Sequence, residues 1–156
     1  MHVLITGVGG FVGSRLARHL LARGDRVSGT YVDARPDLEG VELSAADLLD
    51  RAALERAVGE AAPDAIVNLA GLSHVGESWK RMGDYFRANV LGTENLLAAA
   101  AGRRVVIASS AEVYGAVPEA EQPIAEERPV DPQTPYALTK AAAERLALGQ
   151  GAVVTR

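Results

Sequence analysis

The chain has 156 residues, a net charge of −4 and no cysteine. An acidic chain argues against nucleic acid as the main partner, because phosphate binding requires a basic surface. The lack of cysteine excludes disulfides, thiolate metal sites and a cysteine nucleophile, and the three histidines lack the spacing of metal ligands. The apolar N-terminal stretch is short and broken by glycines. We therefore expect neither a signal peptide nor a membrane span, and predict a cytoplasmic protein.

Short apolar runs alternate with helical stretches along the whole chain. Strands are predicted at residues 2–6, 26–32, within 40–48, at 64–71, at 103–110 and from 151. Helices are predicted at residues 14–24, 48–61, 85–101 and 136–148, the last opened by Pro135. Residues 116–134 are polar, hold four prolines and are predicted to form a loop. This alternation predicts an α/β fold of the Rossmann type, a doubly wound parallel sheet with helices on both faces.

A glycine-rich turn follows the first predicted strand and precedes the first predicted helix. Its glycines are Gly7, Gly10 and Gly13, within "TGVGGFVG". Glycine at such a turn permits unusual backbone angles and the close approach of a pyrophosphate, and the helix N-terminus offers free amides to it. A P-loop is excluded because Ser14 and Arg15 follow Gly13. The turn favours dinucleotide binding over the plainer alternative, a tight turn without a ligand.

Tyr136 and Lys140 share one face of the last predicted helix, because they are four residues apart. A tyrosine is a weak acid with a reference pKa of about 10, and a nearby ammonium stabilises its phenolate. Such a pair can transfer a proton during the interconversion of a carbonyl and an alcohol. Ser109 and Ser110 end the fifth predicted strand, at the edge where such sheets bind ligands. Taken singly, the plainer alternatives are a surface lysine beside a tyrosine, and serines that cap a turn.

Several stretches in consistent order and spacing resemble the extended short-chain dehydrogenase/reductases, the family of nucleotide-sugar epimerases, dehydratases and reductases. They are "TGVGGFVGS", "ADL", "NLAGLSHVGES", "NVLGTENLL", "SSAEVYG" and "PYALTK", and they cover nearly the whole chain. The resemblance implies a catalytic triad of Ser110, Tyr136 and Lys140. It also implies a bound NAD, with NADP as the alternative, whose binding residues are Gly7, Gly10, Phe11, Val12, Gly13, Asp33, Asp47, Leu48, Leu69, Ala70, Gly71, Asn89, Ser109, Tyr136 and Lys140.

Within the family, "NLAGLSHVGESW" and "SSAEVYG" look most like the GDP-mannose 4,6-dehydratases and the GDP-4-keto-6-deoxymannose reductases. Glu112 matches the base that acts at C5 in the dehydratases, and a solvated loop glutamate is an equal alternative. Ala111 stands where dTDP-glucose 4,6-dehydratases have an acid, which disfavours that subclass. The implied reaction is hydride transfer at C4 of a nucleotide-diphosphate sugar. A nucleotide-sugar 4-epimerase, a reductase of small ketones and a non-catalytic dinucleotide-binding fragment or sensor remain alternatives.

The choice between NAD and NADP depends on the end of the second predicted strand. An acidic residue some twenty positions past the fingerprint binds the ribose 2′-hydroxyl and repels a 2′-phosphate, and Asp33 has that spacing from Gly13. Counted from Gly24 without gaps, the usual position for this acidic residue falls on Tyr31. The usual NADP-binding arginine is missing at Val32, although Arg35 could reach a 2′-phosphate if the loop folds back. We favour NAD.

Two expectations concern what surrounds this domain. Family members continue into a smaller C-terminal region that closes over the sugar nucleotide, so residues 1–156 are expected to hold the cofactor half and the catalytic residues without that region, and to be inactive alone. Relatives commonly form homodimers through helices that correspond to residues 89–101 and 137–148, which are rich in Ala and Leu here. Asn89 matches an asparagine behind the site, whose plainer role is to tie its helix to a strand.

Overall fold

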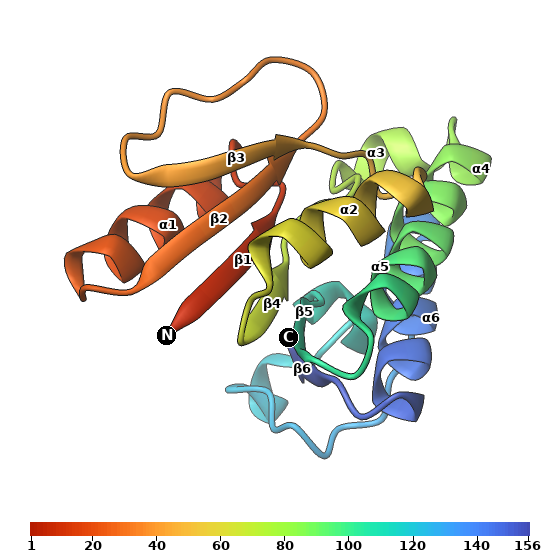
Figure 1. The fold of residues 1–156 in the computed structure, drawn as a ribbon. Coiled ribbons are helices and arrows are strands. Elements are labelled where there is room, and N and C mark those ends of the chain that lie inside the picture. The colour runs from red at the N-terminus through yellow and green to blue at the C-terminus, as the bar shows by residue number, and fades with distance from the viewer.

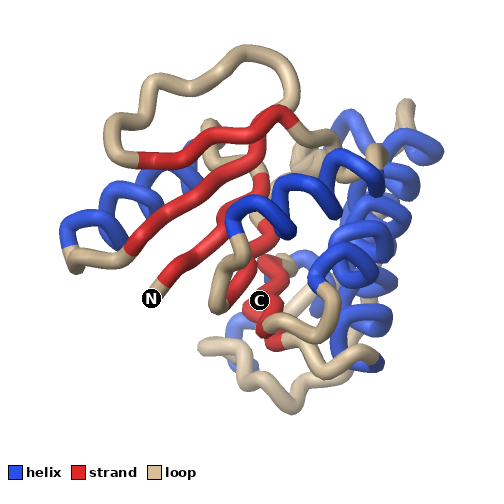
Figure 2. The backbone as a smooth tube through the Cα atoms, in the orientation of Figure 1, coloured by secondary structure: helices blue, strands red, loops and turns tan.

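A six-stranded, all-parallel sheet runs through the centre of the computed structural model, which describes all residues from 1 to 156. The strand order is β3-β2-β1-β4-β5-β6. Figure 2 shows the strands as one twisted layer between helices. The strands are β1 (His2–Thr6), β2 (Arg26–Tyr31), β3 (Val41–Ala45), β4 (Ala65–Asn68), β5 (Arg104–Ala108) and β6 (Val153–Thr155). The predicted doubly wound α/β fold is confirmed.

Helices cover both faces of the sheet, but unequally. Figure 1 shows α2, α5 and α6 together on one side and α1 on the other. Asp50 accepts a hydrogen bond from the Ala53 amide at the start of α2, and Thr134 accepts one from the Ala137 amide at the start of α6. The helices are α1 (Phe11–Ala22), α2 (Arg51–Ala61), α3 (Val75–Ser78), α4 (Met82–Tyr85), α5 (Gly92–Ala100) and α6 (Pro135–Gly149). None of them has both the length and the hydropathy that crossing a bilayer requires.

Two apolar cores lie on the two faces of the sheet, and β1 contributes to both. Leu4 packs with residues of α2 and α5, while Val3 and Ile5 pack with residues of α1. All five residues of β1 are buried, as a strand between two helical layers requires. The central strands are therefore fixed in register by side chains that point alternately to the two cores.

The helix expected at residues 85–101 is longer and less regular than its sequence indicates. It begins at Met82 as α4, passes through a π-helical segment, η1 (Phe86–Leu91), and continues as α5. A π-helical turn adds a residue to the helical repeat and is often found at functional sites. The one-turn helix α3 was not expected either, because four residues give too short a pattern to recognise.

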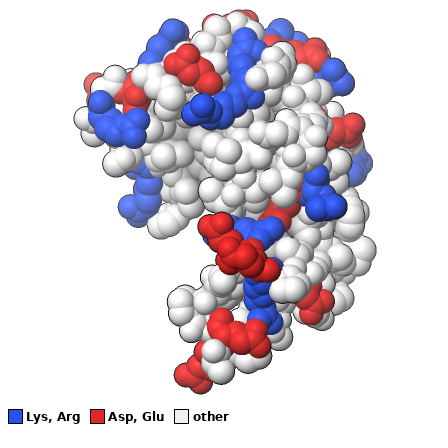
Figure 3. All heavy atoms as spheres, turned by 90° about the horizontal axis from the view of Figure 1, so that it is seen from below, with Lys and Arg blue, Asp and Glu red and all other residues white.

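The segment from 116 to 134 projects from the body of the molecule. It is irregular, as predicted, apart from one short 3₁₀ turn, η3 (Glu119–Glu121). A second 3₁₀ turn, η2 (Ala111–Tyr114), connects β5 to this segment. Acidic side chains gather on the projecting lobe in Figure 3.

A buried histidine makes the stability of this fold dependent on pH. His2 is 9% exposed, and its Nε2 lies 2.7 Å from the Ser28 hydroxyl oxygen. Burial, followed by the nearby charge of Arg26, lowers the pKa of His2 below its usual value. The unfolded chain therefore binds this proton at a higher pH than the folded chain does.

We expect the free energy of unfolding to fall as the pH drops below about 6.5, the ordinary pKa of histidine. The loss should be complete once the pH has passed the lowered pKa of folded His2. Urea unfolding at a series of pH values measures this, with His2→Gln as the control that cannot titrate. An equally steep pH dependence in the variant would show that His2 is not the cause.

Candidate active site

The carboxyl ends of β1, β4 and β5 meet at one edge of the sheet. The chain leaves β1 toward β2 and β3 on one side, whereas β4, β5 and β6 extend the sheet on the other side. Ligands bind in doubly wound sheets at the carboxyl ends of the strands, where the strand order reverses in this way. This position lies between β1 and β4, and every segment described below reaches it.

The glycine-rich turn is packed too closely for any other residue type at two positions. Gly7 has a φ of 67°, and a Cβ there would lie 2.9 Å from the Ala70 Cα. A Cβ on Gly13 would lie 2.5 Å from the Gly7 carbonyl oxygen. Gly10 caps α1 without any side-chain hydrogen bond to the first amides of the helix. The turn thus presents free backbone amides at a helix N-terminus, an arrangement that suits phosphate groups.

Two adjacent cavities share the floor formed by Gly7, Ala70, Gly71 and Leu72. The larger, of about 600 Å³, is lined on the β2 and β3 side by Asp33, Asp47 and Leu48, among others. The smaller, of about 370 Å³, is lined by Gly10, Phe11, Val12, Gly13, Leu69, Ser109, Tyr136 and Lys140, among others. Most of the expected cofactor-binding residues therefore lie along one continuous depression.

Tyr136 and Lys140 reach the smaller cavity from the first turns of α6. Tyr136 is 8% exposed, and its ring packs edge-on against that of Tyr85 with the centroids 6.4 Å apart. The Lys140 ammonium donates a 2.6 Å hydrogen bond to the Ala108 carbonyl at the end of β5. Burial lowers the pKa of Lys140, and the carboxylate of Glu144 partly opposes this effect.

The two serines differ in their surroundings. Ser109 lines the smaller cavity, and its hydroxyl oxygen is buried without a hydrogen-bond partner. Ser110 is the N-cap of η2, where its hydroxyl accepts a 3.2 Å hydrogen bond from the Glu112 amide. Neither Ser110 nor Glu112 lines either of the two cavities, so the structure places both of these predicted catalytic residues outside them, just beyond β5.

Asn89 lies behind the cavities rather than in them. It is 3% exposed, and its side chain exchanges hydrogen bonds with the Leu72 backbone at 2.9 and 3.0 Å. Its amide also donates to the Thr139 hydroxyl at 2.9 Å. The plainer role stated above thus has a structural basis, because Asn89 joins η1 to the segment after β4 and to α6.

Sequence patterns alone did not indicate three of the residues at this site. Thr139 accepts from Asn89, which is fifty residues away in the chain, so no local pattern could reveal the contact. Arg81 and Arg87 line the larger cavity from the α4–η1 helix. Arg81 is paired with Asp84 at 2.8 Å.

No group of three or more His, Asp or Glu side chains gathers as a metal site would require.

This combination of a parallel sheet, a glycine-rich turn and a tyrosine–lysine pair in one depression defines a class of dinucleotide-binding proteins. The NAD dependent epimerase/dehydratase family matches residues 3–152, and the chain belongs to that family. The resemblance stated above is thereby confirmed.

Individual relatives include proteins of several specificities. The dTDP-glucose 4,6-dehydratase of Streptomyces niveus is 36% identical over 181 residues, covering 100% of this chain and 53% of that protein. The GDP-6-deoxy-D-mannose reductase of Pseudomonas aeruginosa is 37% identical, covering 96% of this chain and 47% of that protein. The solved UDP-glucose 4-epimerase of Thermus thermophilus with NAD has a TM-score of 0.91 and 34% identity over 100% of this chain and 54% of its own. The chain thus spans about half the length of these relatives.

The depression fits the dinucleotide cofactor of this family, and similar solved structures hold either NAD or NADPH. Its glycines leave a cradle that a Cβ would fill, and the unpartnered Ser109 hydroxyl offers a hydrogen bond to a ligand. Asp33 lines the larger cavity, whereas Arg35 does not. This arrangement accords with our preference for NAD.

We expect NAD to bind at least tenfold more tightly than NADP, because the Asp33 carboxylate would accept a bond from the ribose 2′-hydroxyl and repel a 2′-phosphate. Tenfold corresponds to about 1.4 kcal/mol. Isothermal titration of both nucleotides against the chain and its Asp33→Ser variant measures the preference. The variant should bind the two more equally, while tighter binding of NADP by the unaltered chain would reverse the assignment.

Proposed function

We propose that this chain provides the cofactor-binding half and the catalytic side chains of an enzyme that transfers hydride at C4 of a nucleotide-diphosphate sugar. The observation that carries the proposal is that Tyr136 and Lys140 line the same cavity as the glycine-rich turn. The relatives named above are a dehydratase, a reductase and an epimerase of nucleotide sugars, and they support the same substrate class.

Each catalytic side chain has a distinct role in this proposal. Tyr136 acts as the general acid or base for the sugar hydroxyl or carbonyl oxygen, and the Lys140 ammonium stabilises its phenolate and binds the cofactor ribose. Ser110 orients the sugar oxygen from its position just beyond β5. When bound, the nicotinamide accepts or returns the hydride.

We place the reaction among the 4,6-dehydratases or 4-keto reductases, with Glu112 as the base at C5 if the enzyme is a dehydratase. Glu112 lies in the turn that Ser110 caps, and its amide donates to the Ser110 hydroxyl, so their proximity supports a shared role. Sequence identity does not decide which reaction the protein catalyses, since a dTDP-glucose 4,6-dehydratase and a GDP-6-deoxy-D-mannose reductase match the chain about equally well. A 4-epimerase is the second candidate, because solved epimerases share the fold closely. A non-catalytic dinucleotide sensor is the third.

The sugar nucleotide requires a second wall that we propose lies outside residues 1–156. Both cavities are lined by segments around the glycine-rich turn, and the relatives are about twice as long as this chain. The isolated chain should therefore bind the dinucleotide without turning over a sugar nucleotide. Formation of a 4-keto sugar by the isolated chain would place the substrate site within it.

Replacing Tyr136 by Phe in the protein extended to the length of its relatives should lower turnover by about 10²–10⁴, the usual contribution of a positioned general acid. Cofactor affinity should stay nearly unchanged, because the ring remains. Tyr85→Phe is the matched control, since it removes a buried hydroxyl that bonds only to the His74 carbonyl. Turnover is followed with a panel of nucleotide sugars as 4-keto sugar formed or consumed, or as 4-epimer formed. Turnover in Tyr136→Phe equal to that of the unaltered protein would remove Tyr136 from the mechanism, whereas no turnover in either protein would favour the sensor.

We also propose that two copies pair through α5 and α6, the helices expected to form a dimer. These helices and the turn before them leave large apolar side chains more than 40% exposed, among them Leu91, Leu138 and Leu148. Sedimentation should show a dimer at micromolar concentration, and Leu138→Glu should shift it to monomer by burying a charge in the interface. Val12→Glu is the control, because Val12 is exposed on α1, on the other side of the sheet from α5 and α6 (Figure 1). A monomer at every concentration would refute the pairing.

A further inference from the structure

A buried carboxylate on α6 has no role in the reaction proposed above. Glu144 is 2% exposed, although glutamate is almost never fully buried without a partner. It follows Lys140 by four residues, just as Lys140 follows Tyr136. The three side chains therefore lie in succession along one side of the helix.

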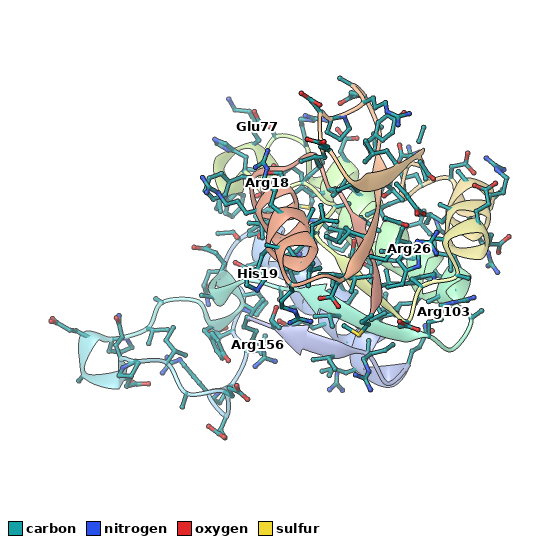
Figure 4. The ribbon with its side chains drawn as sticks, turned by 60° about the vertical axis from the view of Figure 1, so that its left-hand side comes forward. Arg18, His19, Arg26, Glu77, Arg103 and Arg156 are labelled. Atoms are coloured by element: carbon teal, nitrogen blue, oxygen red, sulfur yellow. The ribbon has the colours of Figure 1, made fainter.

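Arg156, the residue after β6, is the partner of this carboxylate. Its Nε lies 3.1 Å from each Glu144 carboxylate oxygen, and its Nη2 donates to Oε2 at 2.9 Å. Its Nη1 donates to the Tyr114 hydroxyl at 2.9 Å and to the Glu126 carbonyl at 3.3 Å. Arg156 thus joins α6 to η2 and to the projecting segment, and Figure 4 shows it where that segment meets the body.

Lys140 is subject to two opposing effects. Burial lowers the pKa of Lys140 because the ammonium loses hydrating water, and the Glu144 carboxylate raises that pKa. The hydrogen bond to the Ala108 carbonyl also favours the ammonium, because a charged N–H donor forms a stronger bond than a neutral amine does. Burial and Glu144 are the two effects that dominate this balance, and the other ionisable groups on α6 or on elements packed against it do not alter it: Glu77, Asp84, Tyr85, Arg87, Glu94, Glu112, Tyr114, Tyr136, Arg145 and Arg156.

We propose that Glu144 is a positioning residue for Lys140, a buried counter-charge that keeps the lysine as an ammonium beside Tyr136 while Arg156 holds Glu144 in place. The inference rests on the proposed function, because it assigns Lys140 the task of stabilising the Tyr136 phenolate. It goes beyond that function by extending the charged chain from the cavity to the end of β6. The Glu144–Arg156 pair thereby acts on the reaction without contacting cofactor or substrate.

The experiment is a titration of Lys140 in the 156-residue chain by NMR with ¹³C-labelled lysine. The chain has only two lysines, Lys80 and Lys140, so the Lys80→Arg variant assigns both signals. Glu144→Gln keeps the shape of the side chain and should lower the pKa of Lys140, because the counter-charge is lost. Arg156→Gln removes the cation that neutralises the Glu144 carboxylate. This variant should therefore raise the pKa of Lys140. Lys80 should titrate identically in all variants.

Opposite shifts distinguish this role from a merely structural one. If the pair only held the packing, either substitution would let water reach Lys140 and raise its pKa. An unchanged or raised value in Glu144→Gln would therefore overturn the proposal. Should that variant fail to fold by circular dichroism, the double variant Glu144→Met, Arg156→Met replaces the buried pair with apolar side chains, a change that proteins often tolerate.

The double variant should also lower the pKa of Lys140, because Glu144 is the member of the pair that acts on it. An unchanged pKa of Lys140 in the double variant would refute the inference. The titration requires neither cofactor nor substrate, so its outcome is independent of the turnover measurement on Tyr136→Phe. A lowered pKa with an inactive extended protein would retain this inference and refute the proposed function.

Discussion

The turn after β1 depends on backbone segments that approach one another more closely than a side chain permits. Gly7 packs against Ala70, Gly13 against the carbonyl of Gly7, and Gly29 leaves room for Val8. These contacts bring the start of α1 against the edge between β1 and β4, and they form the floor that both cavities share. A side chain at Gly7 or Gly13 would push α1 away from the sheet and change the shape of both cavities at once.

Above this floor, hydrogen bonds to main-chain groups fix two side chains of the candidate site. Lys140 is held by the Ala108 carbonyl, and Asn89 is held by the backbone of Leu72. Main-chain groups of the sheet and its edge are rigid, so each bond fixes a helix as well as a side chain. The fold itself therefore sets the position of the tyrosine–lysine pair relative to the glycine-rich turn.

Burial gives the site its electrostatic character. A lysine withdrawn from water loses part of its preference for the charged form, and a carboxylate one turn along the helix restores some of that preference. Relatives named as a dehydratase, a reductase and an epimerase match this chain to similar extents. In the function proposed above, the features that separate them would lie outside the tyrosine–lysine pair, in residues such as Ala111 and Glu112 and in the segments that contact the sugar.

The sequence by itself determined the parallel α/β sheet, its strands to within a few residues, the glycine-rich turn and the tyrosine–lysine pair. These are local patterns, in which periodicity, glycine spacing and an interval of four residues carry the information. Only the tertiary structure decided that Asn89 bonds to Thr139, that the helix before α5 contains a π-helical turn, and that Glu144 is buried against Arg156. The two contacts join different elements of the fold, and a local pattern does not record which elements will meet. The π-helical turn has the same apolar and polar pattern as an ordinary helix, so the sequence does not mark it.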